Sequence, residues 1–207
     1  MPPTFNPGKS FIEIQFPVSK ISKESYKERK SVQSQTLTSL GKWWGRKPLI
    51  LCRAAILGLL FPATTNPVKD REIFLKLLTM DEEGLFHRKN KNIPLKELIH
   101  HLNPEEIEKW AITDEQDNVT DIKPNLTRDE RNQIQRIVFS RLSYDKKLEY
   151  CNRPEQIEGP SNEAWKEINE YFGLNVKSLP ELMTYLGQCR FGEIPLIGDC
   201  FCGGGNI

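Results

Sequence analysis

The chain has 207 residues, of which 38% are hydrophobic and 28% are charged, a composition that suits one large or two small globular domains. No apolar run approaches the roughly 18 residues that a membrane-spanning helix needs, and the start "MPPTFNPGKS" lacks the apolar stretch of a signal peptide. We therefore expect a cytoplasmic protein without a membrane partner.

The net charge of +1 conceals an uneven distribution. Residues 1–53 hold ten Lys or Arg and three Glu, about +7, whereas residues 54–207 hold 19 basic and 25 acidic residues, about −6. A basic segment on a mildly acidic body favours a polyanionic partner for that segment. Solvated lysines on an exposed helix explain the same pattern, so both interpretations stay open.

Cysteine and histidine spacing gives no metal site. The five cysteines are odd in number, irregularly spaced and without a C-x-x-C pair, which speaks against a disulfide framework and against zinc. His100 and His101 are expected on the surface of a helix.

The first third of the chain predicts a strand and two helices. "FIEIQFP" (11–17) alternates apolar and polar residues, as a strand does, and Pro17 would end it. "SKISKESYKERKS" (19–31) favours a charged helix. "KWWGRKP" (42–48) predicts a loop, and Pro48 suits the first turn of the helix "PLILCRAAILGLLF". Because that helix is apolar nearly all round, we expect it to be buried.

The middle of the chain predicts helices and no strand. Several helix starts carry an Asn-Pro pair, or a Thr cap with a Glu three residues later. The predicted helices cover residues 66–80, 94–102, 103–112, 127–151, 161–174 and 179–188. Residues 114–125 predict a solvent loop.

The end of the chain breaks this helical pattern. "EIPLIGD" (193–199) predicts a short buried strand from Ile194, Leu196 and Ile197, followed by "CFCGGGNI". Glycines let a backbone turn tightly and approach a ligand closely, and amides at the start of a following helix would face a polar ligand. The residues with this spacing are Asp199, Phe201, Gly203 and Gly205. A glycine-rich tail is the alternative.

A second stretch, "KWWGRKP", sets two adjacent tryptophans among cations. Aromatic rings interleaved with cations suit stacked bases and phosphates, so we expect nucleic-acid contacts from Lys42, Trp43, Trp44 and Arg46. Alternatively, Trp43 and Trp44 fill the core beneath the basic segment.

Both stretches resemble parts of a family of adenine-specific DNA methylases that carry a zinc ribbon and begin with a domain of unknown function. The glycine loop resembles motif I, D-P-F-x-G-x-G, of the amino-directed DNA methyltransferases, with Cys200 in place of the usual Pro. That family begins with F-P, then E-S-x-x-E-K, then L-H-x-W-W-A-R-[RK]-P-L. The matching residues are Phe16, Pro17, Glu24, Ser25, Glu28, Trp43, Trp44, Arg46, Lys47 and Pro48. Gly41 and Gly45 replace the family's His and Ala.

The resemblance implies a cofactor site for S-adenosylmethionine. Gly203 and Gly205 would pass close to the methionine part of the cofactor, Phe201 would pack beside it, and Asp199 would anchor the loop. Lys47 and Pro48 resemble motif X, T-x-K-P, whose following helix packs beside the same pocket.

The resemblance also implies an incomplete enzyme. No x-P-P-[YFW] element, which would hold the target amine, occurs in the sequence, so no catalytic residue is assigned. We expect a mainly α protein with a few short strands, the N-terminal portion of an α/β, Rossmann-like methyltransferase whose sheet is incomplete in this chain. The expected segments are a basic arm with the motif-X-like helix (1–62), a helical insertion (63–190), and the first strand with the glycine loop (191–207).

The functional expectation is the N-terminal part of an S-adenosylmethionine-dependent DNA methyltransferase. It would act on adenine N6 or cytosine N4, show no activity alone, bind its cofactor weakly or not at all, and have DNA and a C-terminal methyltransferase half as partners. Restriction–modification, phage defence and housekeeping methylation remain open. The alternatives are a non-catalytic helical module that binds nucleic acid or protein, and a purely structural remnant.

Overall fold

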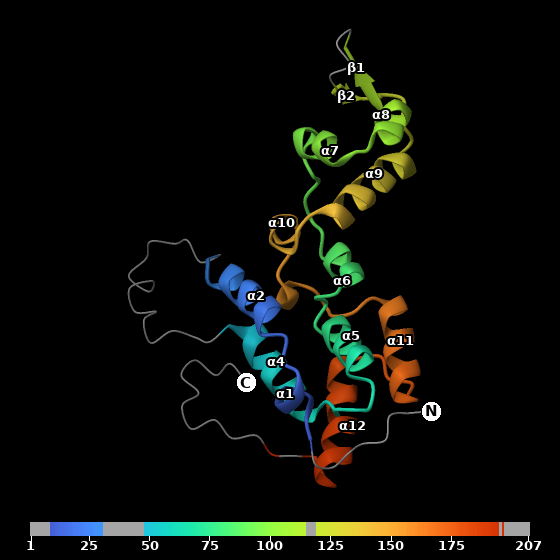
Figure 1. Cartoon of the computed structure of the whole chain (residues 1–207). Coiled ribbons are helices and arrows are strands. Elements are labelled where there is room, and N and C mark those ends of the chain that lie inside the picture. The colour runs from blue at the N-terminus through green and yellow to red at the C-terminus, as the bar shows by residue number, and fades with distance from the viewer. Residues whose placement is uncertain (1–8, 31–47, 115–118, 195, 197–207) are drawn as a thin grey trace. The chain divides into compact units, whose positions relative to one another are not determined.

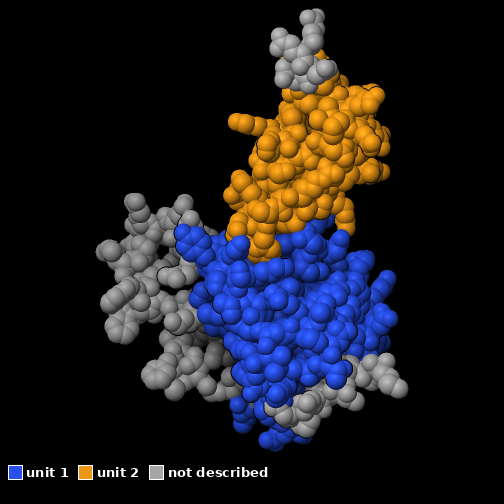
Figure 2. Space-filling model, in the orientation of Figure 1, with its two compact units in different colours: residues 1–88, 153–207 blue, residues 89–152 orange. Residues whose placement is uncertain are grey.

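The computed structural model describes residues 9–30, 48–114, 119–194 and 196 (Figure 1). Within these residues the protein is mainly helical with few strands, as expected, and its strands form one small antiparallel sheet of two strands. The chain divides into two compact units, one made of residues 1–88 and 153–207 and the other of residues 89–152 (Figure 2). The first unit thus joins parts of all three expected segments. None of the helices in the described ranges has the length and apolar character needed to cross a membrane.

In the first unit, α4 contacts several other helices. It packs against α1, α2 and α12, while α5 packs against α11. The side chains of Asn66, Ser161 and Ser178 cap α5, α11 and α12, and α11 ends at Gly173 in the left-handed conformation. The elements of this unit are α1 (Phe11–Ile14), α2 (Val18–Lys30), α4 (Leu49–Leu60), α5 (Pro67–Leu77), α6 (Glu82–His87), the 3-10 turn η2 (Pro154–Gln156), α11 (Asn162–Phe172) and α12 (Leu179–Phe191).

Phenylalanine rings form the core where these helices meet. The rings of Phe11 and Phe74 stack with their centroids 4.2 Å apart, and Phe61 meets both edge-on at 5.4 and 5.9 Å. Phe172 meets Phe61 edge-on at 5.4 Å. All four side chains are buried, and offset or edge-to-face contacts of this kind add to the stability gained from burial. The rings therefore join α1, α5, α11 and the end of α4.

The expected strand at residues 11–17 is wrong, because Phe11–Ile14 form the one-turn helix α1. The Glu13 carboxylate accepts hydrogen bonds from the amide and the hydroxyl of Ser10, each at 2.6 Å, and these bonds lower the pKa of Glu13. A Ser followed by a Glu three residues later is a capping box. This local helix signal outweighs an apolar–polar alternation only a few residues long.

The helix α4 is confirmed, but its burial is less complete than expected. Pro48 lies at the N-cap position, one residue before the helix. One side of α4 packs into the unit, whereas Leu51 and Leu59 are 38% and 50% exposed. Because α4 is apolar nearly all round, its sequence did not indicate which side would pack into the unit.

The second unit contains a short hairpin that the sequence did not indicate. Strand β1 pairs with β2 in antiparallel fashion, with Ala111 opposite Ile122. Residues 119–122, which were expected to lie in a solvent loop, form β2. The sequence did not indicate the two strands, because strands of three and four residues are too short to show a period. The elements of this unit are α7 (Leu95–His101), α8 (Pro104–Trp110), β1 (Ala111–Thr113), β2 (Val119–Ile122), α9 (Arg128–Arg141) and α10 (Tyr144–Tyr150).

Two further expectations need correction. The single helix expected over residues 127–151 is two helices, because Leu142 and Ser143 leave the helical conformation and Ser143 caps α10. The capping box of Thr127 with Glu130 at the start of α9 is confirmed. Near the end of the chain, Ile194 and Leu196 are exposed rather than buried, and Ile197 lies outside the described residues.

A buried carboxylate joins α5, α11 and the loop before α5. Asp70 accepts hydrogen bonds from the Thr64 amide at 2.7 Å, the Thr64 hydroxyl at 2.6 Å and the Tyr171 hydroxyl at 2.6 Å. Burial first, and then the hydrogen bond to Asp70, raise the pKa of Tyr171 well above its ordinary value. The folded state therefore favours the neutral phenol.

We expect Tyr171→Phe to lower the free energy of unfolding at pH 7 by about 1.5–3 kcal/mol, the usual contribution of a hydrogen bond to a charged group. Above about pH 10 the unfolded chain releases the Tyr171 proton while the folded chain retains it, so wild type alone loses this part of its stability. The difference in the free energy of unfolding between wild type and Tyr171→Phe should therefore become smaller between about pH 9 and 11. Urea unfolding measured across that pH range is the test. A constant difference in the free energy of unfolding would contradict the stabilising role of the hydrogen bond from Tyr171 to Asp70.

Candidate functional site

Among the predicted site residues, Pro48 is the one that the structure describes. The other proposed cofactor residues, Lys47, Asp199, Phe201, Gly203 and Gly205, lie outside the described residues. So do the proposed nucleic-acid residues Lys42, Trp43, Trp44 and Arg46. The part of the site within the described ranges is the place where α2 meets the start of α4, which we call the α2–α4 corner: residues 18–30 and 48–60.

A carboxylate from α2 caps the start of α4. Glu28 Oε1 accepts a hydrogen bond from the Leu49 amide at 2.8 Å, and its Oε2 accepts one from the Ile50 amide at 3.3 Å. Pro48, at the N-cap position, has no side-chain acceptor of its own. A negative charge at a helix N-terminus satisfies free amides and complements the helix dipole. Glu28 therefore holds the backbone beside Pro48 against α2.

One turn earlier, a second carboxylate of α2 enters a buried ion pair. Glu24 and Arg88 are bound by two hydrogen bonds, Nη2 to Oε1 at 2.5 Å and Nη1 to Oε2 at 3.2 Å, and both side chains are fully buried. Arg88 directly follows α6. The pair thus connects α2 to α6 and, because it is a two-point contact, it fixes how α2 is rotated about its axis.

The polar residues of the E-S-x-x-E resemblance all face inward from α2. Glu24 and Glu28 are four residues apart and therefore lie on one helix face, together with the buried Ile21. The hydroxyl oxygen of Ser25 is also buried. In the described structure Glu24 and Glu28 attach α2 to its neighbours, a role that the sequence did not show. Arg88, the partner of Glu24, was missed, because no local pattern distinguishes it from a surface arginine.

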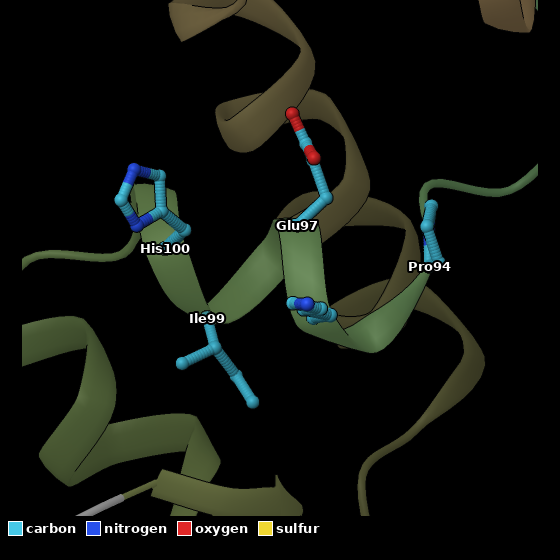
Figure 3. A pocket seen from close by; sticks show the side chains of 5 residues that line it. Pro94, Glu97, Ile99 and His100 are labelled. Carbon is cyan, nitrogen blue, oxygen red and sulfur yellow. The ribbon is translucent and has the colours of Figure 1, made fainter.

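The second unit has an open depression of about 470 Å³, lined by Pro94, Lys96, Glu97, Ile99 and His100 (Figure 3). All of these residues belong to α7 or to its N-cap position. Figure 3 shows Glu97 and Ile99 pointing away from one another rather than towards a common point. A ligand site needs polar groups that converge, so we assign no site here. Over the described ranges, no cluster of three or more His, Cys, Asp or Glu side chains is placed to hold a metal ion.

A family model matches part of the chain. The family described as "Protein of unknown function (DUF1156)" matches residues 15–77. No curated protein and no solved structure gives a significant match. The matched segment contains α2, α4 and α5 and therefore spans the α2–α4 corner.

Proposed function

We propose that the chain is the N-terminal part of an S-adenosylmethionine-dependent DNA methyltransferase that acts on adenine N6 or cytosine N4. The observation that carries the proposal is the Glu28 carboxylate on the two amides that follow Pro48. It gives Glu28, one of the methylase-like E-S-x-x-E residues, a mechanical task, since its carboxylate holds the backbone that follows Pro48 at the start of α4. The resemblance at both ends of the chain supplies the rest of the support.

In the complete enzyme, the chain would contribute the first strand and the glycine loop of a Rossmann-like sheet. The proposed cofactor residues are Lys47, Pro48, Asp199, Phe201, Gly203 and Gly205. S-adenosylmethionine, when bound, supplies an electrophilic methyl group. A fixed start of α4 would keep Lys47 and Pro48 in register with the glycine loop, and positioning of this kind contributes strongly to catalysis.

The DNA contacts of the proposed enzyme lie in the basic stretch before α4. Lys42 and Arg46 would meet phosphates, and Trp43 and Trp44 would stack on bases. A target base must leave the duplex before its amine can be methylated. This chain has no x-P-P-[YFW] element for that amine, so we propose that a C-terminal methyltransferase half supplies it and that the 207 residues alone transfer no methyl group.

The test is a radiolabelled methyl-transfer assay on duplex DNA. We expect no transfer by the 207-residue chain, and transfer by a protein in which the coding sequence after Ile207 adds an N-P-P-Y or D-P-P-Y element. In that longer protein, Glu28→Ala should weaken cofactor cross-linking several-fold. Glu13→Ala, which removes the capping carboxylate of α1, is the matched control and should leave cross-linking unchanged. Turnover by the 207 residues alone would overturn the proposed inactivity, and absence of cofactor cross-linking in the longer protein would overturn the lineage.

A further inference from the structure

Helix α4 is apolar on both of its long sides. Its residues, Leu49–Leu60, include one charged side chain, Arg53, and no acidic one. A surface helix ordinarily presents charged and polar residues on the side away from the core, and a helix that is apolar all round is ordinarily buried. Here one side is buried and the other is not, so α4 has the composition of a helix that packs against two partners.

The exposed side of α4 is formed by a row of apolar residues. Leu51, Ala55 and Leu59 are spaced four apart and therefore line up along the helix. Leu51 is 38% and Leu59 is 50% exposed, and Ala55 between them is half-buried. We call Leu51, Ala55 and Leu59 the outer row of α4. Cys52, next to this row, is half-buried as well. The residues of the opposite side, which are buried in the unit, include Ile50, Leu57 and Leu60.

The size of the outer row argues against a second copy of the chain as its partner. A helix of 12 residues is about 18 Å long and about 10 Å wide, so one side of α4 offers roughly 180 Å². A stable interface between separate proteins buries about 800 Å² on each partner. A domain in the same polypeptide needs far less area, because its effective concentration is about millimolar. The outer row therefore suits a domain that is covalently joined to this unit.

The same unit exposes further apolar residues at the end of α12, a helix that packs against α4. Phe191, the last residue of α12, is 54% exposed, and beyond it Ile194 is 59% exposed and Leu196 is fully exposed. In an extended chain, residues two apart point to the same side, so Ile194 and Leu196 would form one apolar side of a strand. A strand obtains its hydrogen bonds from neighbouring strands, and helices cover a sheet with their apolar sides. A domain that buries both apolar surfaces would thus contribute a β-sheet.

We propose that the outer row of α4 is the docking surface for the apolar face of a β-sheet in the C-terminal methyltransferase half. The inference rests on the proposed function for the existence of that half, and it adds the place where the half packs on the first unit. The core fixes the inner side of α4, and Glu28 fixes its start. A sheet that packs on the outer row would therefore be held at a defined position relative to Pro48.

The test is alkylation by iodoacetamide, followed residue by residue with peptide mass spectrometry, in the 207-residue chain and in the longer protein that includes the coding sequence after Ile207. Native Cys52 beside the row, and Ala55→Cys at its middle, should each react at least about tenfold more slowly in the longer protein, because a packed sheet blocks access to the thiol. Ile112→Cys is the matched control. Ile112 is 41% exposed and lies in the second unit, so this variant should react at the same rate in both proteins.

Leu51→Gln/Leu59→Gln supplies a second readout. In the 207-residue chain the outer row faces water, so the urea midpoint should change little. In the longer protein the midpoint should fall, because the two amide groups would be buried against the sheet without hydrogen-bond partners. Leu51→Met/Leu59→Met keeps the row apolar and should leave both midpoints close to those of wild type.

Equal alkylation rates at residues 52 and 55 in the two proteins would overturn the inference. It would also be overturned by a dimer of the 207-residue chain, seen in sedimentation equilibrium, that the glutamine variant dissociates, because a second copy would then cover the row. Cofactor cross-linking and methyl transfer are read separately. A longer protein that protects residues 52 and 55 but neither cross-links cofactor nor transfers methyl groups would overturn the proposed function and leave this docking surface standing.

Discussion

Arg88→Met is expected to lower the free energy of unfolding of the first unit by about 3–5 kcal/mol, the usual cost of removing one partner from a buried ion pair. The Glu24 carboxylate would then be left inside the protein without the guanidinium that it accepts hydrogen bonds from. Both side chains are fully shielded from water, so solvent cannot take the place of the missing partner. Urea unfolding at pH 7 measures the effect.

Two variants show whether burial causes this loss. Lys69→Met removes one partner of the exposed pair with Glu72, whose side chains are 40% and 46% exposed, and should cost less than about 1 kcal/mol. The double variant Glu24→Gln/Arg88→Met should be more stable than Arg88→Met, because it leaves no unpaired charge at position 24. Equal effects of Arg88→Met and Lys69→Met would show that the buried pair has no special role.

Phe74→Ala is expected to lower the free energy of unfolding by about 3–5 kcal/mol, the range for truncating a buried phenylalanine. The Phe74 side chain is fully buried, and its ring contacts the rings of Phe11, Phe16 and Phe61. Its removal would leave a cavity in the core that connects α1, α4 and α5. Thermal and urea unfolding of the variant give the loss.

A control for Phe74 is available on the same helix. Val68 belongs to α5 but is 77% exposed, so Val68→Ala should change stability by no more than about 0.5 kcal/mol. Phe74→Leu, which refills most of the cavity, should recover part of the stability lost in Phe74→Ala. A loss below about 1 kcal/mol for Phe74→Ala would mean that the ring cluster is not the core of this unit.

Local signals predicted most helix starts correctly. Asn66 and Asn103 accept hydrogen bonds from amides three residues later, as their Asn-Pro sequences indicate, and Thr127 forms its capping box. Gly173 ends α11 in the left-handed conformation. Each of these signals lies within one helical turn of the boundary that it sets, so the sequence shows it directly.

Long-range contacts account for what the sequence did not reveal. Glu24 and Arg88 are 64 residues apart, and Glu28 is 21 residues from Leu49. No pattern within a short window identifies such partners. The resemblance identified Glu24 and Glu28 as matching residues but did not indicate what they do. Their role is to hold α2 against the start of α4 and the end of α6, and these contacts exist only in the folded chain.

The contact between Glu28 and the start of α4 also bears on how the connecting segment can vary in length. It joins the end of α2 directly to the beginning of α4. Insertions or deletions within residues 31–47 would therefore alter that segment without shifting the point where α4 begins, so evolution can remodel the segment while both of its anchors stay in place.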